Sequence, residues 1–358
     1  MSILMFMVRL TRAQQQERTR ASVLAAAKAE FTEHGYALAK IDRIAERAEL
    51  TRGAVYSNFP SKRALYLAVL IDLVETTGQV DPPVPPESLD DALENFARVW
   101  LERLPLGGTA WGGRLQLRSL DGVLDDEHTR EVLAQVTRLE ALLLAIALEA
   151  GAPARRVRLA ELALTLLGGA SHRAEIAPGS GDPFDLTHAC RHLADIRFGD
   201  TWAPPHLPFV TPATPCADSW TAPAGLVDQI SGRQADLASD GLITVLGAGR
   251  LGAAEEAVRS GERTTIVIVT GDPAETGRLV RLRITDLAGC LRRVFAPEAW
   301  QRVRVVLDDD ALVASALGVT DPGDGTEVAV RVRGGMIVAR SSGRGAGHAV
   351  SAVRKATP

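Results

Sequence analysis

The chain has 358 residues, 46% of them hydrophobic, and a formal net charge of −4. This length suits two or three domains, and the hydrophobic content argues against a chain that is disordered overall. The charge is uneven, because residues 1–65 carry 11 basic and 6 acidic residues whereas the remainder carries 29 basic and 38 acidic ones. We therefore expect a small basic head that contacts nucleic acid, joined to a larger acidic remainder.

The N-terminus and the cysteines bear on location. The start M-S-I-L-M-F-M-V-R-L is too short for a membrane span, and its basic residue follows the apolar run, which argues against a signal peptide. We expect residues 1–12 to be a disordered extension, with Met7 as an alternative start. Cys190, Cys216 and Cys290 are far apart and form no C-x-x-C pair, so we expect no disulfide framework and a reducing, cytoplasmic environment.

The first predicted helix covers Ala13 to His34, with Val23, Ala27 and Phe31 on its buried stripe and Gly35 ending it. Two short helices and a tight turn follow. Residues 41–48 place Ile41, Ile44, Ala45 and Ala48 at i, i+3, i+4 and i+7, an apolar face for a small core. The pattern predicts a helix-turn-helix.

The second short helix begins after Thr51, a good N-cap, and its small residues Gly53 and Ala54 allow close backbone approach to a neighbouring surface. Arg52, Tyr56, Ser57 and Asn58 would project from it as donors to phosphates and base edges. Ser61 then caps a third helix, whose free N–H groups and Lys62 would form an anion site.

The segment 19–70, which includes I-D-R-I-A-E-R-A-E-L-T-R-G-A-V-Y-S-N-F-P-S-K, closely resembles the DNA-binding region of the TetR family of bacterial transcriptional regulators. The resemblance implies that residues 51–57 are the recognition helix. It departs from the family at Lys40, where Thr is common, and at Glu49, where the turn usually has Gly. The DNA contacts that we expect are Lys40, Arg43, Thr51, Arg52, Gly53, Ala54, Tyr56, Ser57, Asn58 and Lys62.

Further helices are predicted after the head and after the break D-P-P-V-P-P. They span residues 61–77, 88–104, 114–123, 127–149, 154–174 and 185–198. The resemblance implies a ligand-binding and dimerisation body, whose last two helices pair with their twins in a homodimer. The expected dimer contacts are Leu159, Leu162, Leu166, Leu193 and Ile196.

An effector pocket would lie in this body. The side chains that could line it, although each could equally be core, are Trp100, Leu104, Trp111, Leu115, Leu117, Leu139 and Leu143. His188 and His192 share a helix face at i, i+4, but with no carboxylate on that face we assign no metal. We also assign no cofactor.

The pattern changes after a Pro-rich stretch at 201–225, which we expect to be an extended linker. Residues 264–270, 302–307, 326–332 and 336–340 are predicted strands, and Asp272, Pro273 and Glu275 supply a capping-box start for a helix to Arg293. Strand, helix, strand, helix, hairpin, helix is a thioredoxin-like order, and residues 316–343 resemble the second half of that fold. Where a thioredoxin carries its C-x-x-C redox motif, this chain has G-D-P-A-E-T, which contains no cysteine. Redox catalysis is therefore not expected.

A rival hypothesis starts from I-T-V-L-G-A-G-R-L-G, in which Gly247, Gly249 and Gly252 fit G-x-G-x-x-G after a strand. Asp272 lies about where a ribose-binding acid would be expected, so this domain could bind NAD(P). A single βαβ unit followed by an antiparallel hairpin argues against a doubly wound sheet.

The predicted organisation is multidomain. It consists of an extension (1–12), an all-α helix-turn-helix head (13–60), a helical regulatory and dimerisation body (61–200), a linker (201–225) and an α/β thioredoxin-like domain (226–358). The predicted function is a cytoplasmic, homodimeric, non-enzymatic regulator that acts as a repressor, binds a palindromic double-stranded DNA operator and responds to a small-molecule effector. An interaction or second effector module is the alternative use of the last domain.

Overall fold

The computed structural model describes residues 11–76, 84–104, 110–150, 154–202 and 204–353. Most of the predicted extension lies outside these residues, but its last two positions belong to the first helix, which Thr11 caps with its side chain. The helices of the N-terminal half are α1 (Arg12–Leu38), α2 (Ile41–Arg47), α3 (Arg52–Asn58), α4 (Lys62–Glu75), α5 (Leu89–Leu101), α6 (Ala110–Gln116), α7 (Glu127–Glu149), α8 (Val157–Ile176) and α9 (Pro183–His192).

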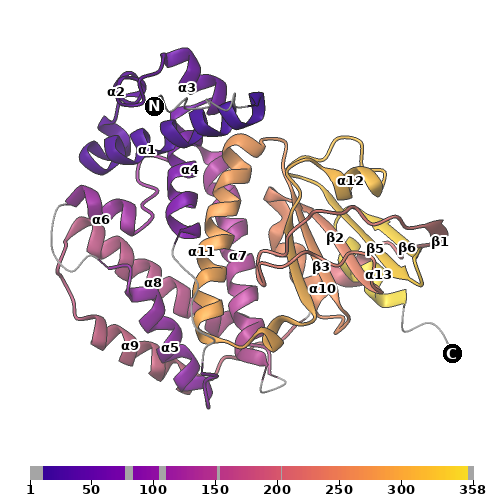
Figure 1. Cartoon of the computed structure of the whole chain (residues 1–358). Helices are drawn as coiled ribbons and strands as arrows, with labels where there is room; N and C mark the ends of the chain where they lie inside the picture. Colours follow the sequence, from indigo (N-terminus) through magenta and orange to yellow (C-terminus); the bar gives the residue numbers. More distant parts are fainter. Residues whose placement is uncertain (1–10, 77–83, 105–109, 151–153, 203, 354–358) are drawn as a thin grey trace, which may run out of the picture.

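The head consists of α1 to α3 and lies at one end of the molecule (Figure 1). Gly35 breaks the helical path of α1 with φ of 66°, as its position in the sequence predicts. Phe31, Ile44, Val55 and Phe59 have no exposed surface. Because one helix contributes each of the first three, burying them together fixes the angles between the helices of the head.

The body consists of α4 to α9. The predicted helix 127–149 is confirmed to the residue, and Asp126 caps it by accepting a hydrogen bond from the Thr129 N–H at 2.8 Å. The predicted helix 114–123 is wrong, because α6 ends at Gln116 and Arg118 takes a left-handed φ of 54°. The predicted helix 185–198 ends early at His192 and continues as a short 3-10 turn.

The C-terminal half contains one six-stranded mixed sheet in the order β1-β6-β5-β2-β3-β4. The strands β2, β3 and β4 run parallel, whereas β5 pairs antiparallel with both β2 and β6. The elements are β1 (Thr214–Ser219), β2 (Gly241–Gly247), α10 (Ala254–Val258), β3 (Thr264–Val269), α11 (Arg278–Val294), β4 (Val303–Leu307), α12 (Leu312–Ala316), β5 (Glu327–Arg333), β6 (Met336–Ser342) and α13 (Ala346–Ala352).

The sheet is covered on both faces, and its parallel strands β2 and β3 are buried almost throughout and mostly apolar. Leu246, Ile266 and Ile268 pack toward α11, whereas Val245 and Val267 belong to a second cluster on the opposite face with residues of α12. This alternation is the period of two expected of a strand, and continuous apolar runs are typical of parallel strands that are buried on both sides.

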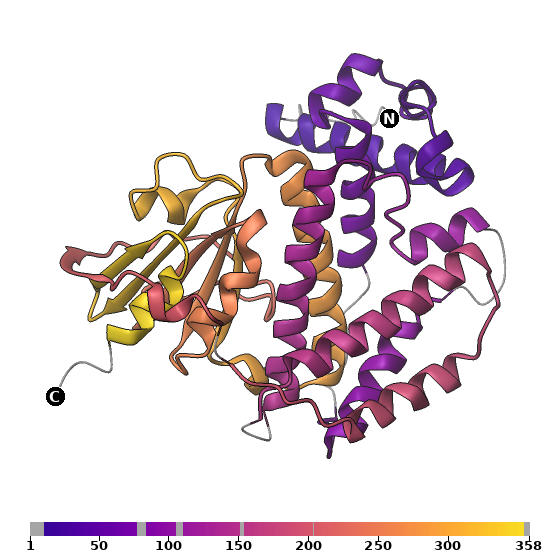
Figure 2. The ribbon, with the colours of Figure 1, turned by 180° about the vertical axis from the view of Figure 1, so that it is seen from behind.

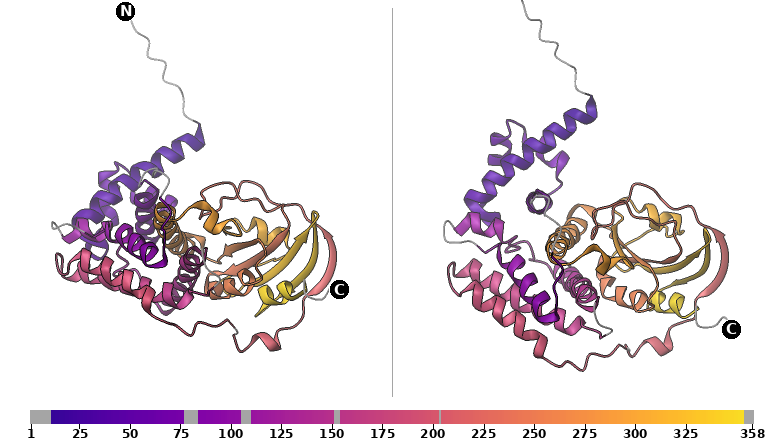
Figure 3. Two further views of the ribbon diagram at one scale, coloured as in Figure 1. Left: turned by 90° about the horizontal axis from the view of Figure 1, so that it is seen from below. Right: turned by 60° about the horizontal axis from the view of Figure 1, so that its bottom comes forward.

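The linker prediction for 201–225 is wrong in part. The segment after α9 does run along the outside of the molecule to the far edge of the sheet (Figure 3). There, however, residues 214–219 form β1, which pairs antiparallel with β6 as an edge strand. Pro215 is compatible with this position because an edge strand leaves half of its backbone groups unpaired.

The two halves share a core, which the sequence did not predict. α11 and α7 stand side by side between the helical body and the sheet in opposite views (Figures 1 and 2). Leu282, Leu287 and Leu291 of α11 belong to the same buried cluster as Leu139 and Leu143 of α7. α11 thus completes the body while it covers the sheet. In the described residues, no helix is both long and apolar enough to cross a membrane.

Candidate DNA-binding surface and its contact with the C-terminal domain

The turn between α2 and α3 keeps its geometry although it lacks glycine. Glu49 has a left-handed φ of 55°, and its N–H donates to the carbonyl oxygen of Glu46. The Leu50 N–H donates to the carbonyl oxygen of Ala45 at 2.9 Å. These two bonds form a Schellman motif, which satisfies the last carbonyl groups of α2. A non-glycine residue here holds strain on the order of 1 kcal/mol.

The helix α3 presents a polar, exposed face. Thr51 caps it, because its hydroxyl accepts a hydrogen bond from the Ala54 N–H at 3.2 Å. Arg52 is 62% exposed; its guanidinium lies 3.5 Å from a carboxylate oxygen of Asp42 and 5.5 Å from the ring centroid of Tyr56. Gly53 is exposed, and a Cβ there would make only an ordinary contact with the Thr51 hydroxyl at 3.8 Å, so another surface can approach the backbone.

The remaining predicted contacts on α3 are also near the surface. Ser57 and Tyr56 are exposed, and Ala54 and Asn58 are partly exposed. The hydroxyl of Ser57 and the amide of Asn58 both donate to the Ala54 carbonyl oxygen at 2.9 Å. Their acceptor atoms and the second amide hydrogen stay available to bases or phosphates.

The predicted phosphate contacts fall into two groups. Lys40 and Arg43 are exposed at the start of α2, and Arg43 lies 3.0 Å from the His34 ring nitrogen. Lys62 instead turns back toward α1, where its Nζ donates to the Ala37 carbonyl oxygen at 3.1 Å and lies 4.8 Å from the Tyr36 ring centroid. Burial lowers the pKa of Lys62. Its side chain would therefore have to leave these partners to contact a phosphate.

Residues 23–69 match the family model described as "Bacterial regulatory proteins, tetR family". These residues form a TetR-type helix-turn-helix domain. The resemblance on which the head was predicted is thereby confirmed.

Three curated relatives share this part of the chain. The HTH-type transcriptional regulator TtgR of Pseudomonas putida is 44% identical over 70 residues, which are 20% of this chain and 33% of the relative. The A-factor receptor protein of Streptomyces griseus is 32% identical over 105 residues, covering 25% of this chain and 38% of the relative. The HTH-type transcriptional repressor SCO4008 of Streptomyces coelicolor is 33% identical over 96 residues, covering 26% and 43%. This chain spans less than half the length of each of these relatives.

Among solved structures, a putative TetR-family regulator from Mesorhizobium loti is 18% identical and covers 52% of this chain and 96% of its own, with a TM-score of 0.26. NalD of Pseudomonas aeruginosa, the secondary repressor of the MexAB-OprM multidrug efflux pump, is 20% identical and covers 50% and 94%, with a TM-score of 0.30. Likenesses with scores this low carry no argument about the fold of this chain.

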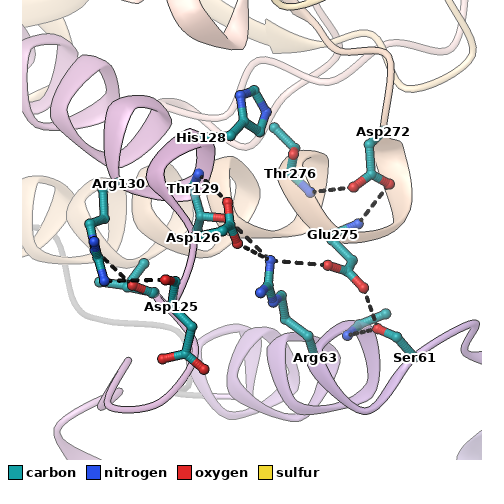
Figure 4. Close-up of polar contacts among 12 residues, drawn as sticks. Ser61, Arg63, Asp125, Asp126, His128, Thr129, Arg130, Asp272, Glu275 and Thr276 are labelled. Carbon is teal, nitrogen blue, oxygen red and sulfur yellow. Dashed lines mark hydrogen bonds and ion pairs between the residues drawn. The ribbon is translucent and has the colours of Figure 1, made fainter.

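A polar junction joins the start of α4, the helix that follows the head, to the start of α7 and to the C-terminal domain (Figure 4). The hydroxyl of Ser61, which caps α4, donates a hydrogen bond to the Glu275 carboxylate, and the guanidinium of Arg63 lies 3.2 Å from the other oxygen of that carboxylate. The same guanidinium lies 2.9 Å from Asp126, the cap of α7. The first turns of α4 and α7 and the turn before α11 therefore meet at one ionic cluster, which we call the junction.

The sequence misassigned Glu275. Asp272 does cap the turn that precedes α11, because its carboxylate accepts from the N–H groups of Ala274, Glu275 and Thr276. The predicted capping box would send the Glu275 side chain back to its own cap, but it goes to Ser61 and Arg63 instead. A carboxylate from the C-terminal domain thus lies at the α4 N-terminus, where the sequence suggested a site for an external anion.

Hydrogen bonds set the charge state of the junction. The Thr129 N–H, the Thr129 hydroxyl and the Arg63 guanidinium hold the pKa of Asp126 at about 2. Beside the junction, Arg278 donates from Nη1 to the carbonyl oxygens of Ala64 and Ala274 at 3.3 and 3.0 Å. Burial, and then the nearby charge of Arg20, lower the pKa of Arg278. Charged groups from three parts of the chain are therefore coupled here.

Most of the described residues predicted to line an effector pocket in the body are core residues, whereas Leu117 is only half-buried. Leu115, Leu139 and Leu143 are buried, and Leu104 packs against the same cluster. The Trp100 indole N–H lies 3.3 Å from the Ser171 hydroxyl. The side chain of Trp111 lies outside the described part. α7 is covered by the C-terminal domain beside Leu143, whose carbonyl oxygen accepts from the Trp300 indole at 3.3 Å.

The geometry does not support the dinucleotide hypothesis. A Cβ on Gly247 would lie 2.3 Å from the Gly323 carbonyl oxygen, so the protein's own loop fills the space that a pyrophosphate would need. The N–H groups of Gly247, Gly249 and Gly252 already donate to Thr326, Asp324 and Gln135. These glycines admit close packing of the chain on itself, and the carboxylate of Asp272 is occupied as a helix cap.

The histidines and cysteines stay without an assigned role. His188 and His192 are exposed, and their rings stack 6.5 Å apart. Burial raises the pKa of the Cys190 thiol to about 12 and that of Cys290 to about 11, so both thiols are protonated at neutral pH. Cys216 is partly buried and donates to the Ile337 carbonyl oxygen at 3.4 Å.

Proposed function

We propose that this protein is a DNA-binding transcriptional regulator of the TetR type, acting as a repressor at a palindromic operator. One observation carries the proposal: the second helix of a TetR-type helix-turn-helix exposes Arg52, Gly53, Tyr56 and Ser57 on one polar face. A helix of this kind fits the major groove, where arginine and amide side chains distinguish base edges. The relatives that share this domain are named as regulators and repressors.

The contacts divide by role. Arg52, Tyr56, Ser57 and Asn58 face the bases, and Lys40 and Arg43 at the start of α2 contact the phosphate backbone. Thr51 positions α3 by capping it, and Gly53 and Ala54 let its backbone approach the groove. The basic excess of residues 1–65 supplies the salt-dependent part of the affinity.

The regulator acts as a homodimer, because a single recognition helix gives little specificity and two of them read a palindrome one helical turn apart. α8 and α9 form the interface that the family resemblance implies, and most of their length lies on the side of the body away from the sheet (Figure 2). Large apolar side chains are exposed here: Ile176 is 68% exposed, Phe184 77% and Ile196 44%. Leu162, Leu166 and Leu193 are partly exposed, whereas Leu159 is buried within the protomer.

Regulation passes through α4, which connects the head to the body. A small-molecule effector changes the tilt of α4, alters the separation of the two recognition helices and lowers operator affinity by about 1 to 3 kcal/mol. α4 packs on α11, so the C-terminal domain is an integral part of this regulatory unit. We propose for it a thioredoxin-like scaffold with no catalytic role, since its first parallel strands are not followed by a C-x-x-C motif.

The test is direct selection of binding sites. Purified protein is incubated with fragmented genomic DNA, and the bound fragments are recovered and sequenced beside those of Tyr56→Ala, which changes only an exposed side chain of α3. We expect one short palindrome to be enriched and to be lost in the variant. Equal recovery of all fragments by both proteins would contradict sequence-specific regulation.

A further inference from the structure

A cavity of about 600 Å³ lies beside the junction, where the head, the body and the C-terminal domain meet. α1 contributes Arg20 and Leu24 to its wall, α4 contributes Ala68 and Ile71, and α11 contributes Arg278. The volume falls within the range of small-molecule sites, which is roughly 300 to 1,000 Å³. The cavity is separate from the core of the body, in which the sequence predicted an effector pocket.

One end of the cavity holds an excess of positive charge. The guanidinium carbons of Arg20 and Arg278 lie 4.8 and 5.4 Å from the ring centroid of Phe59, which is fully buried. In the described part of the chain, no carboxylate forms an ion pair with either of these arginines. Arg281, which also lines the cavity, is paired with Asp309. Two like charges thus share one aromatic ring without a carboxylate at ion-pair distance. Asp309 and Asp272 act on Arg278 only from further away, and several N–H donors of the two arginines remain available to an acceptor.

The other end has the opposite character. Asp72 and Glu75 line the cavity on α4, two and three turns beyond Ala64, the residue whose carbonyl Arg278 contacts. With a rise of 1.5 Å per residue, eight residues of helix place the acidic end about 12 Å from the arginine end. Between the ends, the wall is apolar where Leu24, Ala68 and Ile71 line it. This distribution favours one anionic group at one end and disfavours a second at the other.

We propose that this cavity binds a small amphipathic anion, with one carboxylate or phosphate group held by Arg20 and Arg278 and an uncharged, largely apolar remainder along α4. Guanidinium groups bind both kinds of anion with charge-assisted hydrogen bonds. The apolar wall then selects against inorganic phosphate, which has no hydrocarbon part to bury.

The position of the cavity also explains how ligand binding affects the DNA-binding head. Ala274 and Gly277 line the cavity, and Glu275, between them in the same turn, holds Ser61 at the start of α4. A ligand that moves this turn therefore moves a contact of the head. Ligand binding itself stands without the proposed function; only the effect on operator affinity rests on it.

The experiment is isothermal titration of the full-length protein with octyl phosphate, whose length is close to that of the cavity. Inorganic phosphate and octanol supply the head and the tail alone, and octanoate distinguishes a carboxylate from a phosphate ester. We expect octyl phosphate or octanoate to bind at least tenfold more tightly than inorganic phosphate and at least tenfold more tightly than octanol. Arg20→Gln and Arg278→Gln should each weaken this binding at least tenfold, whereas Arg98→Gln, on the exposed face of α5, should leave it unchanged.

A second variant separates loss of the site from loss of the fold. Ala274→Trp fills the cavity from its wall, keeps both arginines and should abolish binding with little change in the melting temperature. The proposal is overturned if no amphipathic anion binds at millimolar concentration, if inorganic phosphate binds equally well, or if binding survives Ala274→Trp and both arginine variants. Binding without any selected DNA sequence would support the site and contradict the proposed function.

Discussion

The hydroxyl group of Ser61 donates a hydrogen bond to the carboxylate of Glu275, which lies 214 residues later in the chain. Ser61 caps the helix that leads from the head into the body, and Glu275 belongs to the turn that opens α11. The hydrogen bond therefore ties the orientation of the helix-turn-helix to the C-terminal domain. Arg63 pairs with the same carboxylate and with Asp126, so the starts of α4 and α7 and the turn before α11 share one set of ion pairs.

The first prediction concerns this contact. Glu275→Ala removes both the hydrogen bond from Ser61 and the ion pair with Arg63, and we expect it to lower the free energy of unfolding by about 1 to 2 kcal/mol. Glu275→Gln keeps an acceptor for Ser61, so its free energy of unfolding should fall by roughly half as much. Urea unfolding followed by circular dichroism measures both values. Glu298→Ala, at an exposed position of the same domain, is the control, and an equal loss there would contradict the role of the junction.

A second prediction concerns pH. The pKa of Asp126 is lowered from 3.8 to about 2, so its charged form stabilises the fold above the unfolded pKa and loses that contribution as pH falls through about 4 to 2. Asn is also a good N-cap, so Asp126→Asn removes mainly the charge. We expect the variant to be less stable by about 1 kcal/mol at pH 7, a figure discounted because the side chain is 45% exposed.

The difference in stability between the native protein and Asp126→Asn should shrink as pH falls below about 4 and should approach zero only below about pH 2. Stability measured at a series of pH values, with Asp125→Asn beside it, checks this dependence. A difference that stays constant from pH 7 to pH 2 would show that the variant acts through the cap geometry and not through the charge.

The sequence predicted the parts of this molecule in which local signals agree with packing. The apolar stripe of α2, the Thr51 cap and the predicted helix 127–149 all have partners within a few residues, and the structure confirms them. The shared core of α7 and α11 was out of reach, because it joins residues more than a hundred positions apart. The strand β1 was missed because Pro and Thr are typical of linkers, and only its pairing with β6 makes it a strand.

The candidate site shows the same division. The exposed face of α3 follows from sequence spacing, because a helix presents i, i+4 residues together. The partners of Lys62 and Glu275 do not follow from sequence spacing. Lys62 lies against Tyr36, and the side chain of Glu275 accepts from Ser61 instead of bonding at the start of its own helix. A Glu three residues after an Asp before an apolar run is an adequate signal for a helix start and carries no information about a tertiary partner.

The turn between α2 and α3 gives a third prediction. Glu49 adopts φ of 55°, which glycine takes without a steric penalty. Glu49→Gly should therefore raise the free energy of unfolding by about 0.5 to 1 kcal/mol, since the relief of strain exceeds the added entropy of the unfolded chain. Glu46→Gly, inside α2, should instead lower it by about 1 kcal/mol. A loss of stability in Glu49→Gly would mean that its side chain contributes more than its backbone costs.

The fourth prediction separates the two lysines that the sequence predicts as DNA contacts, Lys40 and Lys62. Lys40 is exposed, so Lys40→Ala should reduce the slope of log affinity against log salt by about 1 with little change in stability. Lys62 is held by Ala37 and Tyr36, so Lys62→Ala should lower the melting temperature and change the slope less. Fluorescence anisotropy with the selected operator at several salt concentrations measures both slopes. If Lys62→Ala gives the larger change in slope, its side chain leaves those partners when DNA binds.

The last prediction distinguishes close packing from nucleotide binding at the glycine fingerprint. A methyl group on Gly247 would lie 2.3 Å from the backbone oxygen of Gly323 and 2.4 Å from backbone atoms of Asp324, so no flexible side chain could move aside to admit it. Gly247→Ala should therefore cost about 3 kcal/mol or more of unfolding free energy. Gly289→Ala on α11 is the matched control: nothing lies within 4 Å of its Cβ position, so helix propensity should make it more stable by about 0.5 to 1 kcal/mol.

Millimolar NAD(H) or NADP(H) should leave the melting temperature of the native protein unchanged, because the amides that would hold the phosphates are already bonded within the chain. A clear shift with either nucleotide would show that the loop at Gly323 moves aside and would restore the dinucleotide hypothesis.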